Sequence, residues 1–455
     1  MNTHQNDKHV AEGDVNITPA RETWSTQLPE STQALLAEDA RWFLHQSLST
    51  PCLNVVSAAA GVYLEDVAGN RILDFHGNNV HQLGHGHPRV VSAIIKQLQQ
   101  LPFSPRRYTN ETAVQLAKRL AQLAPGDDSW KLLFAPGAAE AVSMALKLAR
   151  RATGRYKTIS LWGSFHGATM DTIAIGGESL FHKGLGPLLP GALHVPPYLP
   201  RQCVFACGES CSLSCVRYIN TVFEQEGEIG AVIVETIRNT DVVAPPLEYY
   251  QELRAICDRH GALLILDETA IAFGRTGKMF AIEHYNIQPD MIVVGKGLGG
   301  GVFPFAALLA RDDLNIAGDT SIGHFTHEKS PVGAAAALAL LDTLADERLI
   351  ERAAQLEEPF AVKLQKYTSH FSCVGPMRHI GLLFALDIVH PDQPKVPWNA
   401  GAEAILYEAL ARGLSFKVSS GSVLTLSPPL IIEPEQWESA CRILAASIEA
   451  VLKHR

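Results

Sequence analysis

The sequence predicts an α/β fold in which helices cover both faces of a mostly parallel, doubly wound sheet. Between about residue 130 and 310, short runs of Val, Ile and Leu alternate with amphipathic helical patterns. The apolar runs are nearly continuous and do not alternate with polar residues, as expected of strands buried on both faces. This pattern is typical of a large domain built on a parallel sheet.

The strands and helices of this region follow one another in a regular order. A first strand is expected in KLLF (131–134), followed by a Gly/Pro turn and an amphipathic helix. A second strand lies in YKTISL (156–161), just before a turn. Three further buried strands are expected in IGAVIVET (229–236), ALLILDE (262–268) and DMIVVGKG (290–297).

The chain from about residue 336 has a different pattern, in which long helical stretches surround short strands such as GLLFALDIV and SVLTLSPP. This pattern predicts a smaller α+β domain. We therefore expect three parts. They are an N-terminal arm and segment that pack on the small domain and a partner (1–75), a large domain that contains the parallel sheet (76–335) and a small C-terminal domain (336–455).

The composition excludes several kinds of partner. The chain has 455 residues and a formal net charge of −9, which argues against binding to nucleic acid or to an anionic membrane. No apolar run reaches the roughly 20 residues that a membrane span needs. The polar N-terminus lacks the apolar stretch of a secretory signal, so the protein is expected to be cytoplasmic.

Two groups of side chains are candidates for metal binding. Four of the eight cysteines are spaced by four residues, which permits a metal or iron–sulfur site or a surface insertion without an ion. Zinc sites more often pair cysteines as C-x2-C, and the histidine-rich turn at 76–87 has no carboxylate or cysteine at metal spacing. We therefore predict no metal. The spaced cysteines are Cys203, Cys207, Cys211 and Cys215.

Polar residues follow the predicted strands at the point where each strand ends. Glu235 closes AVIVE, Asp267 closes LLILD, and Lys296 follows MIVVG before a glycine-rich run. Ala138 and Ala139 follow the first strand and begin a helix, whose backbone N–H groups can bind an anion. Because ligands of parallel sheets bind beyond the carboxyl ends of the strands, we expect these residues to form one site.

Pyridoxal phosphate matches this set of groups. It has a phosphate, an aldehyde that condenses with a lysine amine, and a ring nitrogen that works best when protonated. Asp267 would hold the protonated nitrogen, Lys296 would carry the cofactor, and Phe165 in GSFHG would cover the ring face. Glu235 belongs either to this site or to a structural contact at the strand end.

The motifs resemble those of the class III, ornithine-transaminase-like branch of the fold-type I pyridoxal-phosphate enzymes. The matching segments are GHGHP (84–88), FHG (165–167), DE…FGRTGKMFAIEH (267–284) and DMIVVGKGLGGG (290–301), in this order. The resemblance covers about residues 60 to 450. It implies the fold-type I transferase fold, with a large and a small domain.

The resemblance also implies a role for each site residue. Asp267 matches the ring-nitrogen partner, Lys296 the cofactor-binding lysine, and Phe165 the stacking aromatic residue. Ala138 and Ala139 match the turn that binds the phosphate. Thr326 matches a threonine that family members donate to the phosphate across a dimer interface, so a homodimer with shared active sites is implied.

The departures from the family pattern concern the substrate. Family transaminases carry an arginine before PPL that binds the substrate carboxylate, and Thr425 occupies this place. A bidentate charged contact is worth about 1.5–3 kcal/mol, so its loss disfavours an α-carboxylate substrate. Thr269 and Ala270 replace the usual Val and Gln, and HFTHEKSP (324–331) replaces the usual Gly-Gly-Asn-Pro run.

We predict an ammonia-lyase that eliminates a hydroxyl from a hydroxylated aminophosphonate and yields phosphonoacetaldehyde and ammonia. The segment GHFTHEKSPVGAAAALALLD is similar to bacterial ammonia-lyases that act on such substrates. In this hypothesis Lys296 removes the proton beside the amine and then protonates the departing hydroxyl. The candidates for binding the anionic group of the substrate are Asn78, Asn79, Arg106, Arg107 and Lys329.

Other interpretations of the sequence remain. Arg106 and Arg107 would equally suit ion pairs at an interface. The leading alternative activity is an ω-aminotransferase that passes an amine to a keto acid. A cofactor-binding regulator without catalysis is a third possibility, against which the presence of both Lys296 and Asp267 argues.

Overall fold

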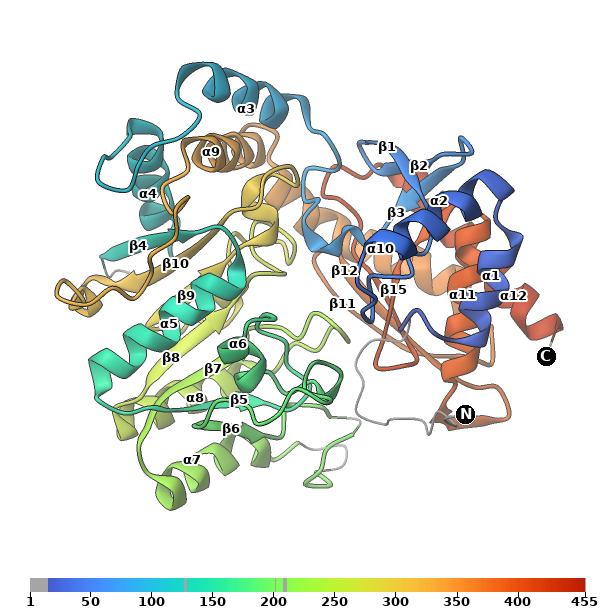
Figure 1. The fold of residues 1–455 in the computed structure, drawn as a ribbon. Coiled ribbons are helices and arrows are strands. Elements are labelled where there is room, and N and C mark those ends of the chain that lie inside the picture. The colour runs from blue at the N-terminus through green and yellow to red at the C-terminus, as the bar shows by residue number, and fades with distance from the viewer. Residues whose placement is uncertain (1–14, 127–128, 201, 208–210, 455) are drawn as a thin grey trace. The chain divides into compact units, whose positions relative to one another are not determined.

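The computed structural model describes residues 15–126, 129–200, 202–207 and 211–454 (Figure 1). Residues 1–14 of the expected N-terminal arm lie outside the described residues. The chain groups into two compact units. The first contains the described residues of Pro88–Asn239 and Val243–Ile350, and the second those of Val10–His87, Thr240–Val242 and Glu351–Arg455. The three-part domain division stays a prediction.

The first unit is built on a seven-stranded sheet with the strand order β4-β10-β9-β8-β7-β5-β6. Neighbouring strands from β9 to β6 are parallel, whereas β10 lies between β4 and β9 and runs antiparallel to both. The predicted mostly parallel α/β fold is therefore confirmed. The strands are β4 (Trp130–Ala135), β5 (Lys157–Leu161), β6 (Ala192–Val195), β7 (Ile229–Glu235), β8 (Leu263–Asp267), β9 (Met291–Val294) and β10 (Ala306–Arg311).

Helices pack on this sheet because successive side chains of a buried strand point to opposite faces. Ile233, Ile265 and Val293 join one core cluster with the apolar side of α5, while their buried neighbours face the other way. Figure 1 shows α5 lying across the sheet. The helices are α3 (Pro88–Gln100), α4 (Glu111–Leu123), α5 (Ala138–Thr153), α6 (Met170–Ile175), α7 (Ser214–Glu226), α8 (Leu247–His260) and α9 (Pro331–Asp346), with 3-10 turns η2 (Ser179–Phe181), η3 (Ala281–His284), η4 (Lys296–Gly299) and η5 (Asp312–Leu314).

Local sequence explains where two of the longer helices stop. α5 ends at Gly154 with φ 66°, and α8 ends at Gly261 with φ 58°. Glycine adopts this left-handed conformation without the Cβ penalty of other residues, so it closes the last turn of a helix. Each glycine returns the chain toward the next strand, β5 or β8.

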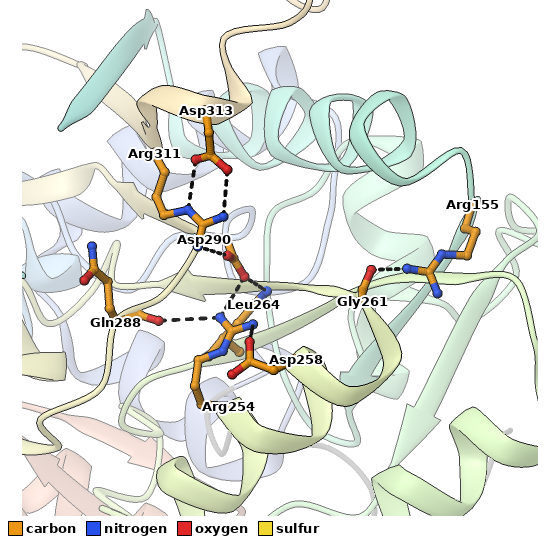
Figure 2. A network of polar contacts seen from close by, with 9 residues as sticks. All are labelled: Arg155, Arg254, Asp258, Gly261, Leu264, Gln288, Asp290, Arg311 and Asp313. Carbon is orange, nitrogen blue, oxygen red and sulfur yellow. Dashed lines mark hydrogen bonds and ion pairs between the residues drawn. The ribbon is translucent and has the colours of Figure 1, made fainter. Parts of the chain in front are cut away.

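A buried ion network fastens the amino ends of β8 and β9, as Figure 2 shows. Asp290 precedes β9 and lies 2.7 Å from Nη1 of Arg254 and 3.0 Å from Nη1 of Arg311. It also accepts the backbone N–H of Leu264 at 2.6 Å. The Asp290 side chain is only 3% exposed, and a buried carboxylate is costly unless it is paired with a cation. The two guanidinium groups supply this pairing.

The second unit combines helices with two sheets in which most neighbouring strands are antiparallel. The first sheet has the strand order β1-β2-β3-β14. The second has the order β11-β12-β16-β15, and β13 also pairs with β12. Trp437 is fully buried and stacks on Phe75 and Phe360. Its elements are α1 (Pro19–Gln27), α2 (Glu30–Trp42), β1 (Val56–Ala60), β2 (Tyr63–Asp66), β3 (Arg71–Asp74), η1 (Gly77–Asn79), α10 (Leu349–Thr368), β11 (Val374–Ile380), β12 (Leu383–His390), β13 (Gln393–Pro397), α11 (Asn399–Ala411), β14 (Leu414–Ser415), β15 (Lys417–Ser419), β16 (Val423–Leu426) and α12 (Pro434–Lys453). Within the described ranges, no helix has the length and hydropathy to cross a bilayer.

Candidate active site

Three of the predicted site residues follow adjacent strands at one edge of the sheet. Glu235 and Asp267 are register partners at the carboxyl ends of the parallel strands β7 and β8. Asp267 pairs in turn with Val293 of β9, and Lys296 follows Val293 by three residues. The structure therefore brings these three residues to the same edge of the sheet.

Asp267 is buried and held by two hydrogen bonds. Its Oδ2 atom lies 2.9 Å from Nδ1 of His166, and its Oδ1 atom accepts the backbone N–H of Thr269 at 3.1 Å. Burial acts to raise the pKa of Asp267, but the contacts with His166 and Thr269 outweigh it and hold this pKa below its usual value. Asp267 is therefore a carboxylate that can pair with a cation at neutral pH.

The segment Phe165–Gly167 lies between the strand ends and the start of α5. The backbone N–H of Phe165 donates to Oε1 of Glu235 at 3.2 Å. The ring of Phe165 is 40% exposed and packs against Phe181, with ring centroids 4.4 Å apart. A Cβ atom on Gly167 would lie 2.6 Å from the Cβ atom of Ala139, so this segment directly contacts the first turn of α5.

The first turn of α5 lies close to the segment that carries Lys296. A Cβ atom on Gly295 would lie 3.0 Å from Cβ of Ala138 and 3.3 Å from Cγ2 of Thr269. The helix start is preceded by Gly137, which has no side chain to cap the N–H groups of the first turn. These N–H groups and the positive end of the helix suit a phosphate.

Lys296 is exposed between two buried glycines, at the start of η4. Its φ angle is 43°, a left-handed conformation that is uncommon for a residue with a side chain. Such backbone conformations cost about 1–3 kcal/mol and concentrate at functional sites, where the surrounding structure maintains them. The buried residues Gly295 and Gly297 therefore hold the backbone of Lys296 in place, and the Lys296 side chain is exposed to solvent.

The remaining basic candidates of this unit lie on two adjoining segments. The side-chain amide of Asn110 donates to the backbone carbonyl of Lys329 at 3.0 Å. The rings of Phe103 and His327 are 5.1 Å apart. Arg106 and Arg107 lie between these two contacts, so the structure places their loop beside the segment that carries Thr326 and Lys329, both of which are exposed.

The other substrate candidates belong to the second unit. Asn78 and Asn79 have φ angles of 46° and 58°, and Asn79 is only 6% exposed. Asp74 supports this turn, because its Oδ1 atom accepts the backbone N–H groups of His76 and Gly77 at 3.0 and 2.9 Å. The contact of Asn78 and Asn79 with substrate stays a prediction.

Thr425, which stands where family transaminases have an arginine, is also in the second unit. It is 2% exposed, and its hydroxyl donates to the backbone carbonyl of Thr240 at 2.7 Å. The hydroxyl is therefore engaged in a short neutral hydrogen bond and supplies no charge for a carboxylate.

Sequence reasoning missed the roles of two buried residues beside Asp267. His166 lies within the FHG motif, in which only the phenylalanine was expected to contribute. Glu268 accepts hydrogen bonds from Thr236 Oγ1 at 2.9 Å and from the backbone N–H groups of Ala281 and Ile282 at 2.7 and 2.8 Å. Burial raises the pKa of Glu268 to about 7. The two consecutive carboxylates therefore have different roles. Asp267 contacts His166, and Glu268 binds the backbone at the start of η3.

The residues of this unit fit pyridoxal phosphate. A helix start without a side-chain cap suits the phosphate, and a buried carboxylate of lowered pKa suits the protonated ring nitrogen. An exposed lysine and a half-exposed aromatic ring lie on the segments that contact these two groups. Each part of the cofactor therefore has a matching group at the same edge of the sheet.

Comparison with known proteins gives the same result. Residues 45–448 match the family model described as aminotransferase class-III. The chain is 44% identical to the (R)-1-hydroxy-2-aminoethylphosphonate ammonia-lyase of Vibrio splendidus (strain 12B01), over 97% of this chain and 96% of that protein. It is 30% identical to the isoleucine 2-epimerase of Lentilactobacillus buchneri, over 93% and 96% of the two chains.

Solved structures agree with these sequence relatives. The crystal structure of the omega transaminase from Pseudomonas jessenii in complex with PMP superimposes with a TM-score of 0.86 at 25% identity, over 92% of this chain and 98% of that one. The extent of the family match and the identity to full-length relatives therefore show that the chain belongs to the class III aminotransferases, a family of fold-type I pyridoxal-phosphate enzymes.

Proposed function

We propose that this enzyme is an ammonia-lyase that acts on a hydroxylated aminophosphonate such as (R)-1-hydroxy-2-aminoethylphosphonate and yields phosphonoacetaldehyde and ammonia. The observation that carries this proposal is the 44% identity to the Vibrio splendidus ammonia-lyase over 97% of the chain. Thr425 supports it, because a site without the carboxylate-binding arginine favours an amine with a different anionic group.

The cofactor would be held by the groups at the carboxyl edge of the sheet. We assign the phosphate to the backbone of Ala138 and Ala139 and the ring nitrogen to Asp267. Phe165 would cover the ring, and Glu235 would position the Phe165 backbone through their 3.2 Å hydrogen bond. Lys296 would bind the cofactor covalently, and Thr326 of a second subunit would complete the phosphate site.

Lys296 would also move the protons of the reaction. When bound, the cofactor withdraws electrons from the carbon that carries the amine and so acidifies its proton. The Nζ atom of Lys296 would take this proton and then protonate the hydroxyl that leaves the adjacent carbon. Water then hydrolyses the released unsaturated amine to the aldehyde and ammonia, so the water lost in the elimination is regained.

The contact between His166 and Asp267 supports the assigned role of Asp267. A buried carboxylate would otherwise take up a proton and lose its attraction for a protonated ring nitrogen. Because the His166 and Thr269 contacts lower its pKa, Asp267 would stay anionic throughout the reaction.

The phosphonate would be bound by basic and amide side chains outside the cofactor site. Arg106, Arg107 and Lys329 are the charged candidates, and the Asn110 and Phe103 contacts place their two segments side by side. Asn78 and Asn79 would add neutral donors. An arginine binds a phosphonate through paired N–H groups, as it binds phosphate.

We further propose a cytoplasmic homodimer with shared active sites. A row of exposed apolar side chains on the second half of α3 and the loop after it would suit a subunit interface. Each of the eight cysteines is a free thiol, as is usual in a reducing compartment. The side chains in this row are Ile95 (51% exposed), Leu98 (49%), Leu101 (37%), Phe103 (38%) and Tyr108 (69%).

An ω-aminotransferase is the second candidate. Its specific support is the TM-score of 0.86 to the Pseudomonas jessenii omega transaminase. The two activities differ in their need for a keto acid, because a transaminase must hand the amine to an acceptor and a lyase need not.

Incubation of the cofactor-loaded enzyme with (R)-1-hydroxy-2-aminoethylphosphonate, without a keto acid, tests the proposal. We expect ammonia and phosphonoacetaldehyde to accumulate in equal amounts over many turnovers. Lys296→Ala should abolish both, whereas Lys278→Ala, which removes another exposed lysine, should not. Conversion of the cofactor to its amine form after one turnover, with recovery by pyruvate, would instead establish the aminotransferase.

A further inference from the structure

The cysteine-rich insertion (residues 203–215), which runs into the first residues of α7, places two thiols side by side. The backbone N–H of Ala206 donates to the carbonyl of Cys203 at 3.0 Å, which closes a tight turn. Ala206 has a φ angle of 50° and reverses the chain, so that Cys207 returns toward Cys203. Cys203 is a hydrogen-bond partner of the Cys207 thiol, and both are free thiols.

Cys207 also lies at the start of a helix. Its Sγ atom is 3.2 Å from Oγ of Ser212, which lies 2.7 Å from Oγ of Ser214, the first residue of the 13-residue helix α7. Hydrogen bonds from the side chain and backbone of Ser212, together with the Cys203 contact and the Ser214 backbone, lower the pKa of Cys207 to about 6. Donors and a helix N-terminus stabilise a thiolate, which is the reactive form of cysteine.

The other cysteines of the chain have different surroundings. Cys215 is 3% exposed, and burial raises its pKa to about 11. Burial likewise raises the pKa of Cys257 and of Cys441 to about 12. No group of three or more His, Cys, Asp or Glu side chains among the described residues is arranged to hold a metal ion. Cys207 therefore combines a lowered pKa with a neighbouring thiol, whereas burial raises the pKa of these three cysteines.

We propose that Cys207 is a peroxide-reactive residue that forms a reversible disulfide with Cys203. The Cys207 thiolate attacks one oxygen of hydrogen peroxide, an S–O bond forms and the O–O bond breaks. The hydroxide that leaves takes up a proton from solvent, equal to the one that the Cys207 thiol lost on ionising, and becomes water. The sulfur of Cys203 then attacks Cys207, an S–S bond forms, the S–O bond breaks, and the hydroxyl leaves with the Cys203 proton as a second water. Two thiols are oxidised and one peroxide is reduced. The contact between the two side chains suits this bond, because a disulfide forms only where two thiols lie next to each other.

Treatment of the cofactor-loaded enzyme with hydrogen peroxide at pH 7, followed by peptide mass mapping, tests the proposal. We expect one disulfide between Cys203 and Cys207 that dithiothreitol reverses. Cys203→Ser should leave a sulfenic acid on Cys207 that dimedone traps, and Cys207→Ser should give neither product. Cys211→Ser and Cys215→Ser, matched changes in the same insertion, should leave the disulfide unchanged.

Two results would overturn the proposal. One is alkylation of Cys207 by iodoacetamide with a midpoint above pH 8, the range of an ordinary thiol, where we expect about pH 6. The other is a stoichiometric zinc ion in the purified enzyme that protects all four cysteines of the insertion from alkylation. These readouts do not depend on which reaction the active site performs.

Discussion

The Nδ1 atom of His166 lies 2.9 Å from Oδ2 of Asp267, and both side chains are buried at the carboxyl edge of the sheet. This pair joins the loop after β5 to the end of β8, two strands that are separated in the sheet by β7. The histidine is therefore part of the site although it is about 100 residues away from Asp267 in the chain.

We expect His166→Phe to raise the pKa of Asp267, because the change removes a hydrogen bond that lowers this pKa and leaves the burial that raises it. Protonated Asp267 would lose its pairing with the cofactor, so the acidic limb of the profile of kcat/KM against pH should move to higher pH. A steady-state pH series measures this. His194→Phe, the same change at a partly buried histidine that does not contact Asp267, should leave the acidic limb in place.

Glu268→Gln should change how stability depends on pH. Burial raises the pKa of Glu268 from 4.5 to about 7, which corresponds to roughly 3 kcal/mol. The folded state therefore binds the proton more tightly than the unfolded state, and this stabilisation is complete below pH 4.5 and is lost as the pH rises through 7. The variant lacks this titration, so its melting temperature should fall less than that of the wild type between pH 5 and 8. If the melting temperature fell equally with pH in the variant and the wild type, the raised pKa of Glu268 would be contradicted.

Asp290→Asn should destabilise the first unit strongly. It leaves the guanidinium groups of Arg254 and Arg311 without their shared carboxylate, and breaking a buried pair costs about 3–5 kcal/mol. Asp313→Asn is the matched control, because this partner of Arg311 is 62% exposed and should cost less than about 1 kcal/mol. Urea denaturation followed by tryptophan fluorescence measures both. A similar midpoint for the two variants would refute a central role for Asp290.

Thr425→Arg should increase activity with α-carboxylate substrates. A bidentate arginine–carboxylate contact is worth about 1.5–3 kcal/mol, so we expect about a tenfold or greater gain in the amine-transfer rate from an α-amino acid. Thr425→Met, which has a long side chain without charge, controls for loss of the hydrogen bond to Thr240 and for the added volume. A gain in the methionine variant as well would show that charge is not the cause.

The sequence predicted the central strands and the residues at their ends because continuous apolar runs and abrupt polar endings are strong local signals. Two strands of the sheet were missed. β6 (Ala192–Val195) is a four-residue edge strand of intermediate burial, and β10 (Ala306–Arg311) is rich in alanine, which has low strand propensity. Both are formed by pairing with neighbours, and a local pattern does not contain that information.

The same limit applies to the connections between segments. The helical stretch after residue 331 reads as continuous, yet it divides into α9 and α10 around Arg348, whose φ angle is 51°. No glycine or proline marks this break in the sequence. The contacts of His166 with Asp267 and of Asn110 with Lys329 join positions far apart in the chain, and only the folded arrangement determines them.

The Asp290 network and the Asp267 site lie at opposite ends of β8, about 10 Å apart at the usual rise per residue, and share no side chain. The contacts that hold the amino ends of the strands are therefore independent of the residues at the carboxyl edge of the sheet. Loops at the carboxyl edge can therefore change during evolution, and with them the reaction, without loss of the Asp290 network. This is consistent with a lyase, an epimerase and a transaminase sharing one fold.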